Sequence, residues 1–275
     1  MSYQTLMVHM QLGRPNTAML TIANALAQHF DAEVIGIAAG QPTQVIYGQG
    51  YPMLDFINQE HALLSQEIID AEHTFKSAFK AYSKPIKWRS MITLGSCASY
   101  IAAESRSADL IITEISPNDF YEGPNGVNAG EIILQCGRPV IVVPENTTTL
   151  KLDNVVVGWK DTREARRAIL DALPLLKLAE QITIIALSSK NEVAQSISSL
   201  EQVVSWLKQH KIIASYENFI AGGDAKTQLV TLANQHNADI LVAGAYGHSR
   251  VYEWAFGGVT NELLQGDKFC CLLSH

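Results

Sequence analysis

A glycine-rich segment near the end of the chain has the residue types and spacing to bind an anion. Its glycines follow a G-x2-G-x9-G spacing: Gly244, Gly247 and Gly257. Glycine lets the backbone approach a phosphate closely and turn successive N–H groups toward it. A helix is expected to begin at Gly258, Val259 and Thr260, where unpaired N–H groups and the Thr260 hydroxyl add donors. The predicted ligand is an anion, most economically a nucleotide polyphosphate.

The apolar run Ile240–Val242 precedes this segment and is expected to form a buried strand. In an open parallel sheet, ligands bind at the carboxyl ends of the strands, so the glycines fall where a ligand site is expected. A simpler interpretation stays open, in which glycine serves only a tight turn from strand to helix. His248 and Arg250 lie beside the loop and could offset phosphate charge or face solvent.

Strands and helices alternate through the second half of the chain. Apolar runs predict the strands Val155–Val157, Ile182–Leu187, Ile212–Tyr216, Ile240–Val242 and Phe269–Leu273. Helices are expected over 165–176, 193–210, 224–236 and 259–264. Pro174 should kink or end the first of these helices, and Asp224 is suited to cap the third. This alternation predicts a parallel sheet with helices on both faces.

The first half repeats this order. Its expected strands are Leu6–Met10, Val34–Ile37, Ile86–Ile92, Leu110–Thr113 and Val140–Val143. Ala108–Ile111 recurs 130 positions later as Ala238–Leu241. The repeat predicts an α/β protein of two tandem copies of a five-stranded parallel sheet in three layers. We place the first domain at residues 1–147 and the second at 148–275, with a Gly, Gln, Pro and Tyr-rich insertion in the first at 41–54.

The last strand of each half is very apolar, at Val140–Val143 and Cys270–Leu273. Such a strand at the edge of a sheet would invite aggregation. Two halves in one chain can bury both edges against each other, so we expect an internal pseudo-dimer in which Val142 lies close to the Leu272 region. A further homodimer is left open.

Composition excludes several classes of protein. The chain has 275 residues, is 47% hydrophobic and 17% charged, and carries a net charge of −7. It can therefore bury a core, and it has no basic field for nucleic acid or an acidic membrane. The uncharged stretch Val34–Leu54 is interrupted by polar residues, glycine and proline, so no spanning helix is predicted. No secretory signal is visible at the start, and a cytoplasmic protein is expected.

The chain shows no familiar catalytic or metal-binding spacing. The histidines form no H-x-H or H-E-x-x-H pattern, and the four cysteines include no C-x-x-C. There is no G-x-S-x-G nucleophile elbow and no G-x-x-x-x-G-K-[ST] loop. We therefore predict no catalytic residues and no metal site. Of the adjacent Cys270 and Cys271, at least one should lie in the core, because neighbours on a strand point to opposite faces.

Three stretches of this chain resemble the universal stress protein family. They are the G-x2-G-x9-G segment after Ala238-Asp239 and an apolar strand, the phrase Val157–Ala165 and the phrase Gly137–Pro144. The resemblance covers nearly the whole chain, as a tandem protein with two domains. It implies a five-stranded, adenine-nucleotide-binding, alpha-hydrolase-like α/β fold, binding of ATP or AMP, and a regulatory rather than catalytic action.

The resemblance also implies a nucleotide site in the second half. Its predicted residues are Gly158, Lys160, Asp161, Ala243, Gly244, Tyr246, Gly247, Gly257, Gly258, Val259 and Thr260. Gly244 and Gly247 would contact the phosphates and ribose, and the segment from Gly257 would hold the outer phosphates. Gly258 stands where the family has Ser or Thr, and Lys160 where it has an acidic residue, with Asp161 one place later. The expected ligand is ATP, ADP or AMP, with Mg²⁺ as a candidate companion.

The first half lacks this motif. Glu114 stands at the position of Gly244, Ser116-Pro117 falls near that of Gly247, and Gly126 alone matches Gly257. A carboxylate repels phosphate and proline lacks an N–H donor, so no nucleotide is expected here in the family manner. This half is expected to be structural, or to hold a different ligand through the loop that contains Tyr47 and Tyr51.

Three further residues have explanations that need no ligand. Asp161 and Glu164 form a D-x-x-E pattern that a helix N-cap explains without a ligand. Trp159 is interpreted as a filler against helices rather than a lid on a base. The leading functional hypothesis is a non-enzymatic, nucleotide-binding stress-response protein. The alternatives are a nucleotide-independent interaction or assembly protein and a weak ATP hydrolase.

Overall fold

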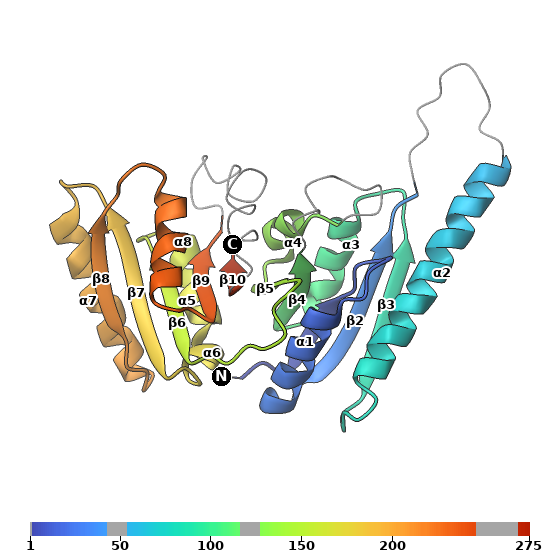
Figure 1. Cartoon of the computed structure of the whole chain (residues 1–275), viewed down its shortest axis with the longest axis horizontal. Coiled ribbons are helices and arrows are strands. Elements are labelled where there is room, and N and C mark those ends of the chain that lie inside the picture. The colour runs from blue at the N-terminus through green and yellow to red at the C-terminus, as the bar shows by residue number, and fades with distance from the viewer. Residues whose placement is uncertain (1, 43–53, 116–126, 246–268) are drawn as a thin grey trace, which may run out of the picture.

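The computed structural model describes residues 2–42, 54–115, 127–245 and 269–275, and their side chains except those of residues 54–57 and 226. Ten strands form one sheet in the order β3-β2-β1-β4-β5-β10-β9-β6-β7-β8 (Figure 1). The strands are β1 Thr5–His9, β2 Glu33–Gly40, β3 Ile86–Ile92, β4 Leu110–Ile115, β5 Val140–Pro144, β6 Asn154–Trp159, β7 Gln181–Ser188, β8 Ser215–Ile220, β9 Ile240–Gly244 and β10 Cys270–Ser274.

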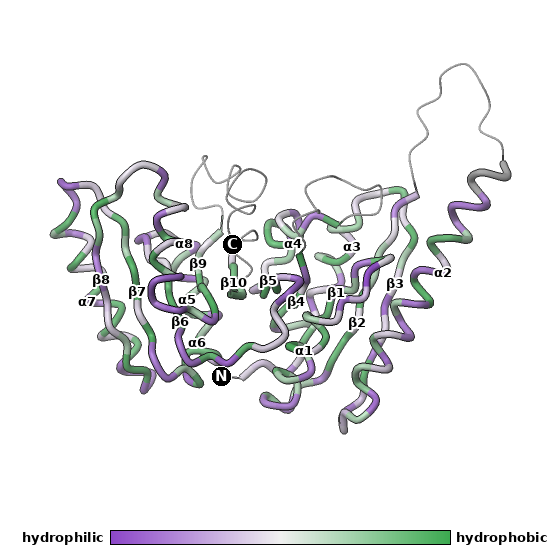
Figure 2. The backbone as a smooth tube through the Cα atoms, viewed as in Figure 1, coloured by the Kyte–Doolittle hydropathy of each residue, from purple (hydrophilic) through white to green (hydrophobic). Residues whose placement is uncertain are grey.

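Helices lie on both faces of this sheet. They are α1 Thr17–Phe30, α2 Leu54–Ala78, α3 Cys97–Glu104, α4 Ala129–Cys136, α5 Arg163–Asp171, α6 Leu173–Leu176, α7 Val193–Gln209 and α8 Ala225–Gln235, with a short 3-10 helix at Ser105–Ser107. The tube coloured by hydropathy shows apolar residues in the inner strands of the sheet, and apolar and polar stretches that alternate along the helices (Figure 2). The predicted α/β fold with a large, mostly parallel sheet is therefore confirmed. None of the described helices carries an apolar stretch that could span a lipid bilayer.

The two halves have the same strand order and register. β1 lies between β2 and β4 with Leu6 opposite Leu110, and β6 lies between β7 and β9 with Val155 opposite Ile240. All pairs within each half are parallel. This repetition agrees with the internal repeat in the sequence, and the domain boundary near residue 147 stays a prediction.

The halves join through their last strands. β5 and β10 pair in antiparallel orientation, with Cys271 opposite Val142 and Leu272 opposite Ile141. The expected proximity of Val142 to the Leu272 region is thus present. All four cysteines are free and buried, including both Cys270 and Cys271. Burial raises the pKa of the Cys271 thiol to about 12, which keeps it protonated and inert at neutral pH.

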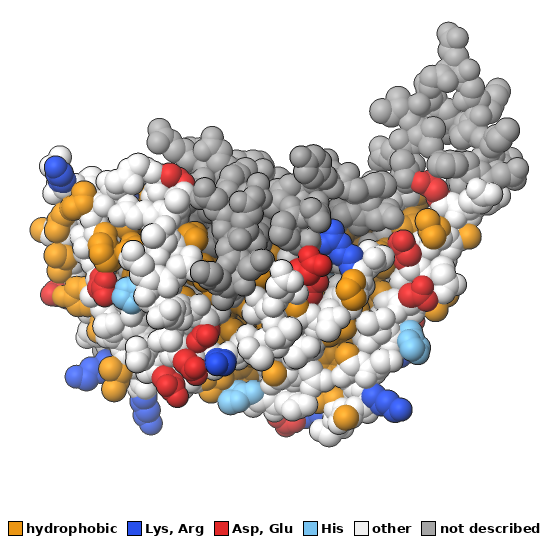
Figure 3. All heavy atoms as spheres, in the orientation of Figure 1, with side chains coloured by type: hydrophobic (Ala, Val, Ile, Leu, Met, Phe, Trp, Pro, Cys, Tyr) orange, Lys and Arg blue, Asp and Glu red, His pale blue; other side chains and the backbone are white. Residues whose placement is uncertain are grey.

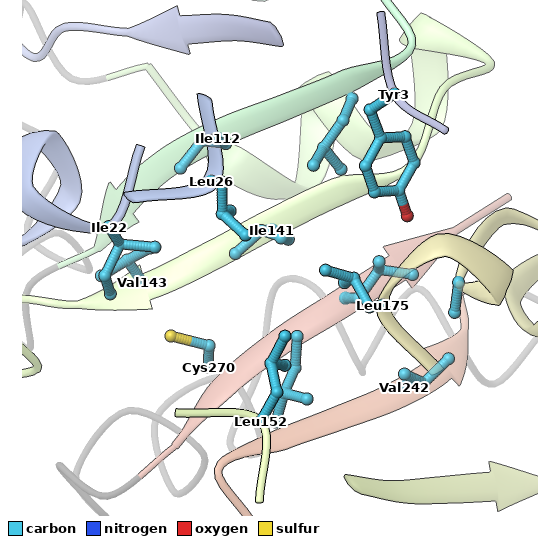
Figure 4. Close-up of a cluster of buried hydrophobic side chains, with 14 of the residues drawn as sticks. Tyr3, Ile22, Leu26, Ile112, Ile141, Val143, Leu152, Leu175, Val242 and Cys270 are labelled. Carbon is cyan, nitrogen blue, oxygen red and sulfur yellow. The ribbon is translucent and has the colours of Figure 1, made fainter. Parts of the chain in front are cut away.

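One face of the joined sheet carries a hydrophobic core that continues across the β5–β10 pair. Side chains from α1, β5, α6 and β10 meet there, among them Leu26, Ile141, Leu175 and Cys270 (Figure 4). The buried Tyr3 hydroxyl donates a hydrogen bond to the carbonyl oxygen of Asp171 at 2.6 Å, and so ties the start of the chain to α5. Burial, with the nearby Asp171 carboxylate, raises the pKa of Tyr3 far above its usual value.

Local signals in the sequence mark some of the element boundaries. The predicted interruption at Pro174 is present, because α5 ends at Asp171 and Pro174 lies in the first turn of α6. The Asp224 carboxylate accepts hydrogen bonds from the backbone and hydroxyl of Thr227 at the start of α8. The strand predicted at Ile212–Tyr216 was misplaced, because β8 begins at Ser215. Ile212 is buried at the end of α7, where its N–H bonds the Leu207 carbonyl after Lys211 adopts a left-handed conformation.

The continuous core makes the β5–β10 pair a sensitive place for substitution. We expect Leu272→Ala to lower the free energy of unfolding by about 3 kcal/mol, because it opens a cavity in a fully buried site. Leu170→Ala, at a partly exposed position of α5, should cost less than about 1 kcal/mol. Urea denaturation of both variants measures the difference. Equal losses would contradict a shared core at this position.

Candidate functional site

The carboxyl ends of β6 and β9 lie side by side in the second half. Gly158 of β6 is opposite Ala243 of β9, so the ends of both strands reach the same edge of the sheet. The chain runs outward from β6 to β7 and β8 and then crosses back to β9 on the other side of β6. Strand order therefore reverses between β6 and β9, and open α/β sheets bind ligands at such a point.

The structure brings together five of the predicted nucleotide-site residues at this edge: Gly158, Lys160, Asp161, Ala243 and Gly244. The others lie outside the described residues: Tyr246, Gly247, Gly257, Gly258, Val259 and Thr260. The positions in the first half at Tyr47, Tyr51, Ser116, Pro117 and Gly126 also lie outside them.

Gly244 is where strand β9 meets the first turn of helix α5. A Cβ at this position would lie 2.5 Å from the backbone nitrogen of Ala165 and 2.5 Å from the carbonyl carbon of Glu164. Backbone atoms cannot yield as a flexible side chain can, so any larger residue would push the helix off the strand. Packing by itself thus requires glycine at this first position of the motif.

Gly158 has a corresponding role on the opposite face. A Cβ there would lie 2.7 Å from Cδ2 of Leu229 in α8. Ala243, its neighbour across the strands, is also buried. At this edge α5 packs closely on one face of the sheet and α8 on the other. These positions shape the edge, and any contact between a ligand and Ala243 would involve its backbone.

Helix α5 begins with a cap different from the predicted one. The cap is Thr162, whose Oγ1 accepts a hydrogen bond from the Ala165 N–H at 3.4 Å. The interpretation of Asp161 with Glu164 as the cap is therefore wrong by one residue. Oδ1 of Asp161 instead accepts hydrogen bonds from Nε and Nη2 of Arg166, at 3.0 and 2.8 Å. Both Asp161 and Lys160 are exposed at the edge.

A second carboxylate occupies the first turn of α5. Glu164 is buried, and its Oε1 lies 3.0 Å from Nη2 of Arg163. Burial works against its charge, but hydrogen bonds from its own N–H and from Thr162, together with Arg163, hold the pKa of Glu164 below its usual value. The start of α5 is thus already supplied with an anion from the chain itself.

A row of polar side chains runs beneath α7. The Trp159 Nε1–H donates to Oγ of Ser199 at 3.1 Å, while Ser196 and Ser188 both bond the side chain of Asn218. Trp159 is buried, which confirms its interpretation as a filler against helices. No sequence pattern predicts this row, because serines spaced along a helix are ordinarily solvated.

The first half has a carboxylate where the second half has Gly244. Glu114 is buried at the end of β4, and its Oε2 accepts a hydrogen bond from the Met19 N–H at 3.0 Å. Met19 is the third residue of α1, as Ala165 is of α5. The carboxylate therefore fills the space between β4 and α1. In the second half there is no such space, because β9 and α5 are in close contact at Gly244. Sequence reasoning found this substitution but missed its partner, which no local pattern reveals.

A buried histidine replaces Gly158 in the first half. His9 lies in β1, and its Nδ1 is 2.9 Å from Oγ1 of Thr113 in β4. Burial lowers the pKa of His9 to about 4, so the ring is neutral at physiological pH. Within the described residues, its Nε2 has no hydrogen-bond partner. Over residues 2–42, 54–115, 127–245 and 269–275, no group of three or more His, Cys, Asp or Glu side chains is arranged to hold a metal ion.

These features describe an α/β protein with two similar halves. In the second half, strand order reverses between β6 and β9, where sheets of this kind bind ligands, and in the first half the Glu114 side chain fills the corresponding space between strand and helix. No family model matches the chain. A universal stress protein of Synechocystis sp. is 23% identical over 147 residues, covering 53% of this chain and 50% of that protein. The match thus spans about half the length of this curated relative.

Solved structures support the same comparison at the level of the fold. A universal stress protein from Archaeoglobus fulgidus superposes with a TM-score of 0.70 at 14% identity, covering 98% of this chain and 95% of that one. A protein from Pseudomonas aeruginosa, described as a candidate universal stress protein, has a TM-score of 0.59 at 12% identity, with 99% and 93% covered. The chain has the universal stress protein fold, and its predicted resemblance to that family is confirmed.

The contact between Gly244 and α5 can be tested by one methyl group. We expect Gly244→Ala to lower the free energy of unfolding by about 2 kcal/mol, since the new Cβ would meet backbone atoms. Gly222→Ala is the matched control, because a Cβ there meets nothing within 4 Å and a change below about 1 kcal/mol is expected. Thermal or urea unfolding measures both. A harmless Gly244→Ala would show that α5 does not pack as described.

Burial of His9 predicts a particular dependence of stability on pH. The native pKa of about 4 lies below the ordinary 6.5, so at acidic pH the unfolded chain binds a proton that the native protein does not. Stability should fall from pH 6.5 to pH 4, by about 3 kcal/mol from this residue. In His9→Leu that loss should be absent. Unfolding curves at several pH values give the difference, and wild-type and variant curves that run parallel would disprove the assignment.

Proposed function

We propose that the chain binds an adenine nucleotide at the carboxyl edge of its second half and acts in stress response as a regulatory, non-enzymatic protein. The observation that carries the proposal is the position of the glycine-rich segment. It follows directly from β9, at the point where strand order reverses beside β6. Backbone amides in such a position suit phosphate oxygens, and the resemblance to universal stress proteins favours an adenine nucleotide.

The first turn of α5 narrows the choice of phosphate-binding groups. Its Ala165 amide donates to Oγ1 of Thr162, and its buried Glu164 carboxylate is paired with Arg163. A phosphate placed there would meet a negative charge. We therefore assign the phosphates to the segment 247–260 rather than to α5, with the exposed Lys160 as a candidate counter-charge from the end of β6.

The first half lacks the glycine-rich segment to which the phosphates are assigned, so binding is proposed for the second half alone. In the first half, the buried Glu114 carboxylate takes the corresponding helix amide, that of Met19. The proposed stoichiometry is one nucleotide per chain, as ATP, ADP or AMP. Mg²⁺, if it takes part, would accompany the phosphates. Turnover is not proposed, because the sequence offers no activated nucleophile or base for the phosphates.

Nucleotide titration tests this proposal. Purified protein is titrated with ATP, ADP and AMP, with and without Mg²⁺, by calorimetry. We expect one site, and we expect Gly247→Asp and Gly257→Asp each to weaken ATP binding at least about tenfold, because a carboxylate would face the phosphates. Gly222→Asp is the matched control, since that glycine is exposed in open space.

Each result has a distinct meaning. If both aspartate variants bind ATP as tightly as the wild type, the nucleotide does not bind at the glycine-rich segment. A wild-type protein that binds none of the three nucleotides would support the alternative of a nucleotide-independent interaction protein. Steady release of ADP that a single side-chain substitution abolishes would support the weak hydrolase instead.

A further inference from the structure

Three carboxylates follow β6 and β7 at the carboxyl edge of the second half, and two of them are held by arginines of α5. Oδ1 of Asp161 accepts a hydrogen bond from Nη2 of Arg166 at 2.8 Å. Oε1 of the buried Glu164 lies 3.0 Å from Nη2 of Arg163. The third carboxylate, that of Glu192, lies between β7 and α7 and forms no ion pair with a described side chain.

The Glu192 carboxylate is oriented by Ser189, the first residue after β7. Its Oε2 accepts hydrogen bonds from the Ser189 hydroxyl at 2.6 Å and from the Ser189 N–H at 3.4 Å. Within the described residues, its Oε1 accepts none. Glu192 is exposed, and the turn from β7 into α7 lies at the surface, at the upper left of the molecule (Figure 1 and Figure 3). The carboxylate is thus held in place and remains accessible to a ligand.

The end of β7 lies beside the end of β6. Trp159 of β6 is opposite Ala186 of β7, so Lys160 and the turn after β7 reach the same edge of the sheet. Hydrogen bonds from Ser189 lower the pKa of the Glu192 carboxyl, and the positive charge of Lys160 lowers it further. Glu192 is therefore ionised at neutral pH, next to the strand ends to which the nucleotide is assigned.

We infer, on the basis of the proposed function, that Glu192 binds the ribose hydroxyl groups of the nucleotide and makes the site selective for ribonucleotides. In doubly wound dinucleotide-binding folds a carboxylate accepts hydrogen bonds from the ribose in this way. With the phosphates on the β9 side of β6 and the ribose on the β7 side, the nucleotide lies across three neighbouring strand ends. Neighbouring strands are about 5 Å apart, a span that an extended nucleotide covers.

Removal of the Glu192 charge distinguishes ribose binding from mere proximity to the nucleotide. A carboxylate that only lies near the phosphates repels them, so its removal would tighten the binding of every adenine nucleotide. A carboxylate that accepts hydrogen bonds from the ribose stabilises only nucleotides that carry the hydroxyl groups. Its removal would therefore weaken the binding of those nucleotides alone.

Calorimetric titration of the full chain with ATP and with 2′,3′-dideoxy-ATP tests this role. The wild type should bind ATP about tenfold more tightly than dideoxy-ATP, because the second nucleotide lacks both hydroxyl groups. Glu192→Ala should weaken ATP binding about tenfold and should not weaken the binding of dideoxy-ATP. Glu180→Ala is the matched control, since Glu180 is exposed at the opposite end of β7, and it should leave both affinities unchanged.

The outcomes separate this role from nucleotide binding itself. If the wild type binds both nucleotides equally, or if Glu192→Ala changes both affinities by the same factor, Glu192 does not bind the ribose, and the nucleotide site stands without it. A wild type that binds neither nucleotide would overturn the proposed function and the role of Glu192 together.

Discussion

The antiparallel pairing of β5 with β10 is the constraint on which the rest of this structure depends. Each strand is almost wholly apolar, and each would be an outer edge if its half stood alone. By pairing, they satisfy each other's backbone groups and turn two five-stranded sheets into one of ten strands. The core then continues across the pair on one face, and Tyr3 adds a hydrogen bond to α5. The only remaining edges within the described sheet are β3 and β8.

The two halves share this arrangement of strands, but they differ in how the first helix packs against the carboxyl ends of the strands. Where the second half has Gly158 and Gly244, the first has His9 and Glu114 at corresponding register positions. Glycine lets a helix approach the strand until backbone meets backbone. A buried glutamate instead spans a wider gap and satisfies a helix amide with its own carboxylate. The backbone arrangement is repeated, while the chemistry at the edge is not.

This difference explains why the fold by itself does not assign a function to each half. A glycine that permits close packing and a glycine that permits a phosphate to approach look alike in a sequence. Gly244 has a packing reason in the contact with Ala165. The case for a nucleotide therefore rests on strand β9, which ends at the reversal of strand order just before the glycine-rich segment, and on the resemblance to universal stress proteins. The Glu114 carboxylate, which stands on β4 where β9 has Gly244, counts against a phosphate in the first half.

The sequence alone determined the alternation of strands and helices, the internal repeat and the apolar character of the final strands. These features are local, because hydrophobic period, proline and capping residues act over a few positions, as Pro174 and Asp224 show. It misplaced β8 and the α5 cap, where neighbouring residues are equally suitable and packing decides between them. Only the tertiary structure could pair Glu114 with Met19, His9 with Thr113, and Tyr3 with Asp171. Those partners are far apart along the chain, and they meet because the sheet sets the distance between strand and helix.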